Sequence, residues 1–295
     1  SWSRGLGDVY KRQDINRPLA DLFVELNNDP RFLFEDSDEG REAILDEYRR
    51  INEETYAMLP DYFNELPKAK VVVKRVPIFS EKSAAGGYYQ GSSLDGSRPA
   101  AWYANLYDIN ATQTFKMPAL SFHEAVPGHH LQIALNQENP NQTLWNKFGY
   151  RTSAFSEGWA LYAERLAVEA GLLRDPYEQI GSLQSELFRA ARLVVDTGLH
   201  SKKWTREEAI IYMMDNAGEV RSESESEIER YIVWPGQATS YMIGRIKIME
   251  LRERAKAELG NRFNIKDFHS VVLMNGILPL TVLEALVDQY IKENS

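Results

Sequence analysis

Apolar residues recur along most of the chain with the period of an α-helix. Between Asp38 and Leu66 they lie near every 3.6th position, which predicts one long amphipathic helix. Similar patterns predict helices over 153–170 and from about 280 to 293. Another amphipathic stretch runs from Pro235 to Leu259 and ends before a glycine, a common residue just past a helix end. The pattern therefore predicts a mainly α-helical chain.

Two further helix starts are marked by capping residues. Asp175 precedes Pro176, an arrangement typical of an N-cap followed by the first helical residue. Thr205 and Glu208 have the spacing of a capping box. The run of serine and glutamate at 222–229 is also expected to be helical, because apolar residues follow it on one stripe: Ile228, Tyr231, Ile232 and Trp234.

The helical period is interrupted between residues 68 and 108. Three short β-like runs occur there, at 71–73, 87–89 and 101–104, separated by stretches rich in Gly, Ser and Pro. We expect them to form a small antiparallel sheet that precedes a cluster of histidines. Its edge is predicted to flank that cluster.

Composition excludes several classes of protein. The chain has 295 residues and a net charge of −9, which argues against a nucleic-acid-binding role because that role requires a basic face. It contains no cysteine, so disulfides, thiolate nucleophiles and cysteine-ligated zinc are excluded. No apolar run approaches the roughly 20 residues of a membrane span. Residues 1–13 resemble translated adapter sequence and are expected to be foreign, leaving 14–295 as a single helical domain.

The strongest chemical signal is a cluster of three histidines within eight residues, in the segment from Ser121 to His130. Glu124 stands beside the first of them, His123. A lone histidine is usually structural, but imidazoles and a carboxylate together are the ligands that zinc prefers. The cluster therefore predicts a site for one divalent metal ion.

The spacing of the cluster leaves the second ligand open. In the usual His-Glu-x-x-His helix the fifth position is a histidine, whereas here it is Pro127. His129 and His130 would lie about 9 and 10.5 Å along a straight helix from His123, too far to share an ion. Either Pro127 and Gly128 loosen the turn and bring His129 round, or one helix ends before Pro127 and another begins there. We favour His129.

Glu157 is the candidate for the third ligand. It lies 28 residues after His129, among Phe155, Trp159 and Leu161, where a buried carboxylate would be costly without a cation. The alternative is a solvated glutamate on an amphipathic helix. Glu124 points to another side of its helix from His123 and is placed to act as general base, since a metal lowers the pKa of water toward ~7.

Five motifs in order along the chain resemble a bacterial family known as domain of unknown function 885. They are His-Glu-Ala-Val-Pro-Gly-His-His-Leu-Gln (123–132), Phe-Ser-Glu-Gly-Trp-Ala-Leu-Tyr (155–162), Arg-Leu-Val-Val-Asp-Thr-Gly-Leu-His (192–200), a Glu-Arg-Tyr and Trp-Pro-Gly run (229–241) and Asp-Phe-His (267–269). Members of this family resemble helical gluzincin zinc peptidases. The resemblance implies one zinc ion held by His123, His129 and Glu157, with Glu124 as base. It also implies a longer protein, of which this is the C-terminal portion, in the periplasm or envelope.

The resemblance adds residues that spacing alone does not indicate. His200, oriented by Asp196 one helical turn earlier, could bind a substrate carbonyl or the oxyanion, or the two could form a helix-end salt pair. Tyr241 could donate its phenol to the oxyanion or be a core aromatic. Arg230 could hold a substrate carboxylate or a surface ion pair. His269 is expected to be structural. His130 and Glu164 are kept as supporting residues of undecided role.

The fold expected is thus a helical, zincin-like metallopeptidase domain with a small antiparallel sheet. Residues 100–105 are the candidate edge strand that holds an extended peptide, which makes Ala101, Trp102 and Tyr103 candidates for substrate binding. The expected function is zinc-dependent hydrolysis of peptide bonds in short peptides. The alternatives are a metal-dependent hydrolase of other amides or esters, and a catalytically silent binding protein that keeps the fold.

Overall fold

The computed structural model describes residues 18–295, so the expectation for residues 1–13 lies outside the described part of the chain. Within it, helices make up most of the molecule, as predicted. The helices before the histidine cluster are α2 (Leu19–Asn28), α3 (Asp38–Tyr62) and the short α4 (Ile78–Glu81). Those from the cluster onward are α5 (Met117–Glu124), α6 (His129–Glu138), α7 (Ser153–Glu169), α8 (Pro176–Ser201), α9 (Arg206–Ala217), α10 (Arg221–Val233), α11 (Gln237–Leu259), α12 (Ile265–Leu273) and α13 (Leu280–Asn294).

The capping residues predicted from the sequence take the expected roles. Asp175 accepts hydrogen bonds from the first amides of α8, and Thr205 with Glu208 forms a complete capping box at the start of α9. The stripe predicted for the serine and glutamate run is only half right. Ile228 and Tyr231 are buried in α10, whereas Ile232 and Trp234 beyond them are exposed.

The sheet is mixed, which corrects the antiparallel prediction. Its strands are β1 (Val71–Arg75), β2 (Gly87–Gln90) and β3 (Ala100–Ala104), in the order β1-β3-β2. β3 runs parallel to β1 and antiparallel to β2. The prediction failed because residue patterns identify strands but not their order. The chain crosses from β1 to the far edge, forms β2 there, and returns to insert β3 between them.

The central position of β3 also contradicts its assignment as the edge strand that holds a peptide. Ala101, Trp102 and Tyr103 are paired with β1 on one side and β2 on the other, so no main-chain groups remain for a substrate strand. Trp102 is fully buried and its ring lies 4.1 Å from that of Tyr48, in α3. These residues therefore belong to the core, and β1 and β2 are the edges.

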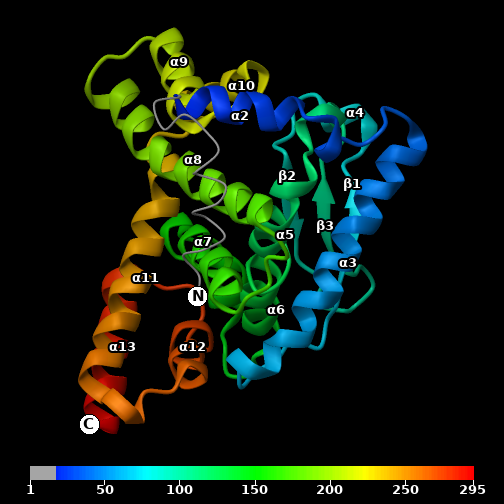
Figure 1. Cartoon of the computed structure of the whole chain (residues 1–295). Helices are drawn as coiled ribbons and strands as arrows, with labels where there is room; N and C mark the ends of the chain where they lie inside the picture. The colour runs from blue at the N-terminus through cyan, green and yellow to red at the C-terminus, as the bar shows by residue number, and fades with distance from the viewer. Residues whose placement is uncertain (1–17) are drawn as a thin grey trace.

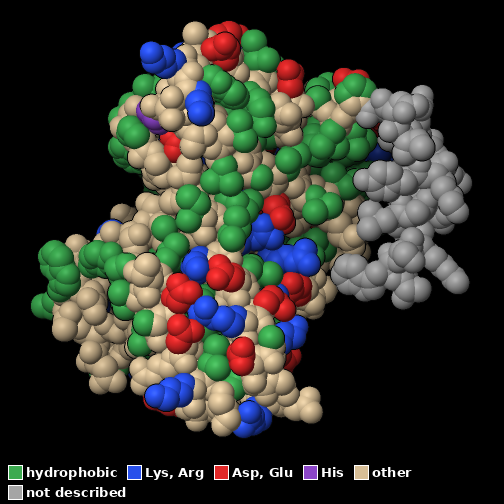
Figure 2. All heavy atoms as spheres, turned by 90° about the vertical axis from the view of Figure 1, so that its left-hand side faces the viewer, with side chains coloured by type: hydrophobic (Ala, Val, Ile, Leu, Met, Phe, Trp, Pro, Cys, Tyr) green, Lys and Arg blue, Asp and Glu red, His purple; other side chains and the backbone are tan. Residues whose placement is uncertain are grey.

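Helices α5, α6 and α7 lie at the centre of the molecule, between the sheet with α3 on one side and α11 with α13 on the other (Figure 1). The largest core cluster joins the three C-terminal helices to α7 around Trp159, Tyr162 and Phe268. Figure 2 shows positive and negative side chains interspersed over the lower part of the face that α11 and α13 form. Ion pairs such as Arg254 with Glu284 join these two helices.

Two glycines let α7 and α11 pack with their backbones in contact. A Cβ atom at Gly244 would lie 1.8 Å from the carbonyl oxygen of Ala154, and one at Gly158 would lie 2.5 Å from the backbone of Gly244. Any larger residue would force these helices apart. We call this contact the α7–α11 seam.

No helix among the described residues is long and apolar enough to cross a membrane.

Candidate metal centre

The histidine cluster lies where one helix ends and the next begins. α5 ends at Glu124 and α6 begins at His129, with non-helical backbone angles at Ala125 and Gly128. A Cβ at Gly128 would lie 2.0 Å from the carbonyl oxygen of His123, so only glycine fits this close turn. The Trp159 indole donates a hydrogen bond of 2.9 Å to the Pro127 carbonyl and fixes the turn to α7. Of the two expectations for this segment, the structure has the pair of separate helices.

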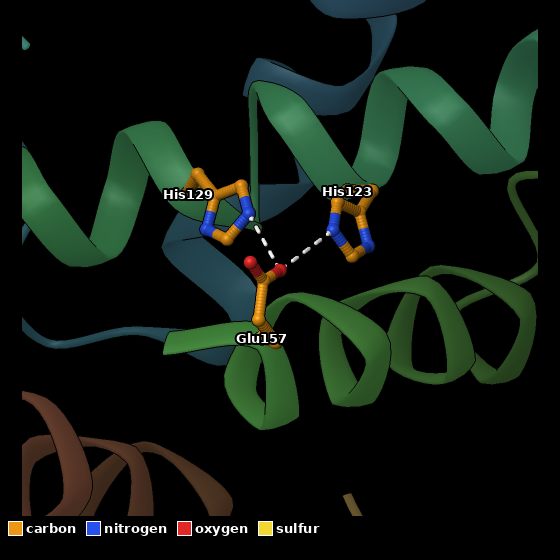
Figure 3. A group of neighbouring side chains, drawn as sticks. All are labelled: His123, His129 and Glu157. Atoms are coloured by element: carbon orange, nitrogen blue, oxygen red, sulfur yellow. Dashed lines mark ion pairs between the residues drawn. The ribbon is translucent and has the colours of Figure 1, made fainter. Parts of the chain in front are cut away.

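The break nevertheless brings the three predicted ligands together. His123 at the end of α5, His129 at the start of α6 and Glu157 from α7 point toward one another (Figure 3). Oε2 of Glu157 lies 3.4 Å from Nε2 of His123 and 3.2 Å from Nε2 of His129. The candidate ligand atoms all lie within 4.8 Å of one another. Two imidazoles and one carboxylate, with a fourth position left open, are typical of catalytic zinc.

Burial and charge at this cluster suit a cation. Oε2 of Glu157 and Nδ1 of His129 are buried without a hydrogen-bond partner among the described residues. Burial alone would raise the pKa of Glu157, but the charges of the adjacent His129 and His123 imidazoles hold that pKa well below its usual value. Burial also disfavours protonation of His123, yet the carboxylates of Glu157 and Glu164 beside its two ring nitrogens raise its pKa to about 9. The cluster therefore attracts positive charge, and its donor set fits zinc.

Glu164 accepts a hydrogen bond from the ring nitrogen of His123 that does not face Glu157. Nδ1 of His123 donates a hydrogen bond of 2.7 Å to Glu164, whose other oxygen accepts one of 2.7 Å from the Ser185 hydroxyl. This fixes the tautomer that leaves Nε2 facing Glu157, a common arrangement around metal ligands. The sequence left this residue undecided, although it stands seven positions after Glu157 and hence on the same helix face.

Tyr241 lies beside the three candidate ligands. Its ring is 6.0 Å from the His123 ring and nearly parallel to it. Burial is the main reason that the pKa of Tyr241 is raised, and the charge of Glu157 adds to it, so the phenol keeps its proton. Gln237 donates a hydrogen bond of 3.4 Å to its hydroxyl, and the guanidinium of Arg192 lies 4.4 Å over its ring. Gln237 and Arg192 both stand in the motifs of the family resemblance, but the sequence predicted no role for either of them.

Glu124 ends α5 next to His123 and is 7% exposed. Its carboxylate has no hydrogen-bond partner among the described residues, and its negative charge helps to raise the pKa of His123. It is therefore near the candidate ligands without being one of them.

His130, by contrast, points away from the other two histidines of the cluster. Its Nε2 donates a hydrogen bond of 2.9 Å to the Ala69 carbonyl, and its Nδ1 accepts one of 3.0 Å from the Tyr89 hydroxyl. Burial lowers its pKa to about 4, so it is neutral. Both ring nitrogens therefore join α6 to the sheet region. The sequence left the role of His130 undecided, and in the structure this role is structural.

The remaining predicted residues do not contact the three candidate ligands within the described part of the chain. Asp196 and His200 form the expected pair at 3.2 Å. Asp196 also accepts a hydrogen bond from the Gly236 amide, and His200 donates one to the Tyr231 carbonyl. Arg230 is hydrogen-bonded to Glu227 and to Gln237, and so reaches Tyr241 only through the latter.

His269 holds α12 in the core. Its Nδ1 donates a hydrogen bond of 2.8 Å to the Tyr62 carbonyl, and its Nε2 accepts one of 2.7 Å from the Tyr162 hydroxyl. It joins three helices and lies with its ring stacked on Phe63.

A family model described as bacterial protein of unknown function, DUF885, matches residues 7–287. The chain belongs to this family. The DUF885 chain is 43% identical to a candidate lipoprotein of known structure from Colwellia psychrerythraea, with a TM-score of 0.92. A second candidate lipoprotein of unknown function, from Shewanella oneidensis, is 23% identical with a TM-score of 0.77 and shares the fold.

These alignments cover nearly all of the DUF885 chain, 98% and 95%, but only 48% and 52% of the two relatives. The chain thus spans about half the length of these proteins. No curated protein matches it.

Proposed function

We propose that this DUF885 chain carries the metal centre of a zinc-dependent peptidase that acts on short peptides. The observation that carries the proposal is the convergence of His123, His129 and Glu157 from three helices on one point. Oε2 of Glu157 supports it, since it is buried, makes no hydrogen bond among the described residues and faces both imidazoles at 3.2 and 3.4 Å. A buried carboxylate is costly unless a cation compensates its charge.

Each residue around this point would have a separate task. His123, His129 and Glu157 would hold the ion, and Glu164 would orient the first of them through Nδ1. When bound, zinc supplies a Lewis acid and lowers the pKa of a water molecule to about 7. Glu124 would accept the proton of the attacking water.

Tyr241 would then donate its phenol to the oxyanion that forms on the carbonyl oxygen. Its raised pKa suits this task, because the hydroxyl must carry a proton to donate. We also propose that His200, oriented by Asp196, contacts a part of the substrate farther from the metal. Arg230 would bind a substrate carboxylate.

The strand proposed to hold the peptide is now β2. It is an edge strand, and it lies against the helices of the centre. A Cβ at Gly87 would touch Leu120 of α5 at 3.8 Å, and one at Gly91 would touch Ile133 of α6 at 3.3 Å. An extended substrate could pair with its free main-chain groups.

We also propose that the protein is associated with the bacterial envelope. The support is the description of both structural relatives as candidate lipoproteins.

The proposal is tested by metal analysis together with cleavage of a peptide library. Wild-type protein should retain one zinc after dialysis, whereas Glu157→Ala should lose it. Glu124→Gln should keep zinc but lower hydrolysis at least ~10²-fold, the usual scale for loss of a general base. A wild-type protein without stoichiometric zinc would favour the silent binding protein. A zinc protein that cleaves esters or other amides but no peptide would favour the second alternative.

A further inference from the structure

A cavity lies beside Glu164 and is lined in part by that residue. Residues of α7, α8 and α11 form most of its lining, it is partly open to solvent, and its volume is about 220 Å³. One water molecule needs only about 10–15 Å³ by the same kind of measure, so the cavity can hold a small organic molecule. None of the functions considered so far uses it.

Most of the lining is apolar. Leu161 and Val168 of α7, Leu173 from the following turn and Leu183 of α8 form its walls. An apolar chain of a ligand would be stabilised here by roughly 25 cal/mol for each Å² removed from water.

The polar groups in the cavity have hydrogen-bonding capacity to spare, and this includes the donors of Arg245 that its ion pair with Glu186 does not use. Both oxygens of Glu164 are occupied, one by His123 and the other by Ser185. Arg245 uses only Nη1, which lies 2.7 Å from Glu186. Its Nε is buried without a partner among the described residues.

Two neutral side chains add to these donors. The Ser182 hydroxyl and the Gln179 amide line the cavity, and neither makes a hydrogen bond within the described residues. Unused donors around a guanidinium favour an anionic acceptor, and carboxylates bind guanidinium groups in matching geometry. The acceptor end of a ligand is therefore expected at Arg245.

We propose that this cavity is a binding site for a small amphipathic carboxylate, with its apolar chain against the leucines and its carboxylate on Arg245. The site does not rest on the proposed peptidase function. Two sources share this chemistry: a free aliphatic acid, and a short apolar peptide with its C-terminal carboxylate. They differ in the ammonium group of the peptide, which could share the carboxylate of Glu186 with Arg245.

Calorimetric titration of the whole chain with octanoate, octanol and leucyl-leucine tests the proposal. We expect octanoate to bind at least tenfold more tightly than octanol, because the carboxylate adds a charge-assisted hydrogen bond. Tighter binding of leucyl-leucine than of octanoate would identify a peptide as the source, and the reverse order an aliphatic acid. Equal binding of octanoate and octanol, or no binding of either carboxylate at millimolar concentration, would overturn the proposal.

Two pairs of variants locate the binding. Arg245→Met should weaken octanoate binding about tenfold, whereas Arg254→Met should leave it unchanged. The control residue is on the same helix but pairs with Glu284. Leu183→Trp should block the cavity from its exposed rim, whereas Val194→Trp, at another exposed position of α8, should not. Since Leu183 is 57% exposed, its replacement should not unfold the protein, and unchanged binding in this variant would refute the site.

Discussion

His123 uses its two ring nitrogens for different purposes, and this division organises the whole centre. Nδ1 is committed to Glu164, which leaves Nε2 to face Glu157. Neighbouring His130 has both nitrogens committed to Tyr89 and Ala69. At the scale of single residues, hydrogen-bond partners therefore distinguish the candidate ligand His123 from the structural His130, seven residues later in the chain.

The first prediction compares the two adjacent histidines. His129→Ala should lose zinc, because it removes one of three proposed ligands. His130→Ala should keep zinc and lower the melting temperature, because it removes two buried hydrogen bonds that tie α6 to the sheet. Elemental analysis after dialysis against a chelator, with thermal unfolding of each variant, makes the measurement. Loss of zinc from the His130 variant alone would reverse the assignment.

The second prediction concerns the support of His123. Glu164→Gln should weaken zinc affinity by about 10- to 100-fold, the usual effect of losing the residue that orients a metal-bound histidine. Glu169→Gln is the matched control on the same helix, since that carboxylate pairs with Arg252 instead. Competition titration with a chromophoric chelator gives both affinities. Equal affinities in the two variants would show that Glu164 does not act through His123.

The sequence predicted much of which side chains come together here, but not all of it. His123, Glu124 and Glu157 are identified by residue type and spacing alone. The choice of His129 depends on the backbone angles at Ala125 and Gly128, which no pattern encodes. Arg192 reaches Tyr241 only because α8 and α11 pack side by side, so its place could not be read from the chain.

At the scale of elements, the break between α5 and α6 produces the arrangement of the candidate ligands. The capping residues of α8 and α9 were predictable because caps are local. The order of the strands was not, because it depends on contacts between distant segments. The sequence thus predicted the positions of helices and strands along the chain well, and poorly which strands lie next to one another.

The third prediction tests the break through its glycine. Gly128→Ala should destabilise the protein by more than about 2 kcal/mol, because the new Cβ would overlap the His123 carbonyl at 2.0 Å. It should also weaken zinc binding, since the shift would displace His129. Gly86→Ala is the control, with no atom within 4 Å of the added Cβ. Chemical denaturation gives the free energy of unfolding of the two variants. Similar values for Gly128→Ala and Gly86→Ala would contradict this account of the turn.

At the scale of the whole molecule, His269 makes stability depend on pH. Burial lowers its pKa from 6.5 to about 4, and the nearby charge of Arg252 adds to this effect. The unfolded chain therefore binds a proton more readily than the folded one between these values. Stability from this residue is complete above about pH 6.5 and is lost as the pH falls toward 4.

The fourth prediction follows from that sign. Between pH 7 and pH 5, His269 should account for a loss of about 2 kcal/mol in the free energy of unfolding. His269→Gln should show a correspondingly flatter pH dependence, even if it is less stable throughout. His200→Gln, which alters a partly exposed imidazole, serves as control. Denaturation at several pH values measures the slopes, and parallel curves for wild type and the His269 variant would refute the prediction.

The α7–α11 seam limits how the molecule can move. Glu157 lies next to one of its glycines and Tyr241 lies one turn before the other, so these two side chains travel together as parts of one rigid body. His123 and His129 belong to a different pair of helices. If the centre opens and closes during a functional cycle, α5 and α6 must move relative to the α7–α11 pair, and the hydrogen bonds from Trp159 to Pro127 and from His123 to Glu164 oppose that motion. Relaxation-dispersion experiments would then detect exchange at α5 and α6 relative to α7, and none across the seam.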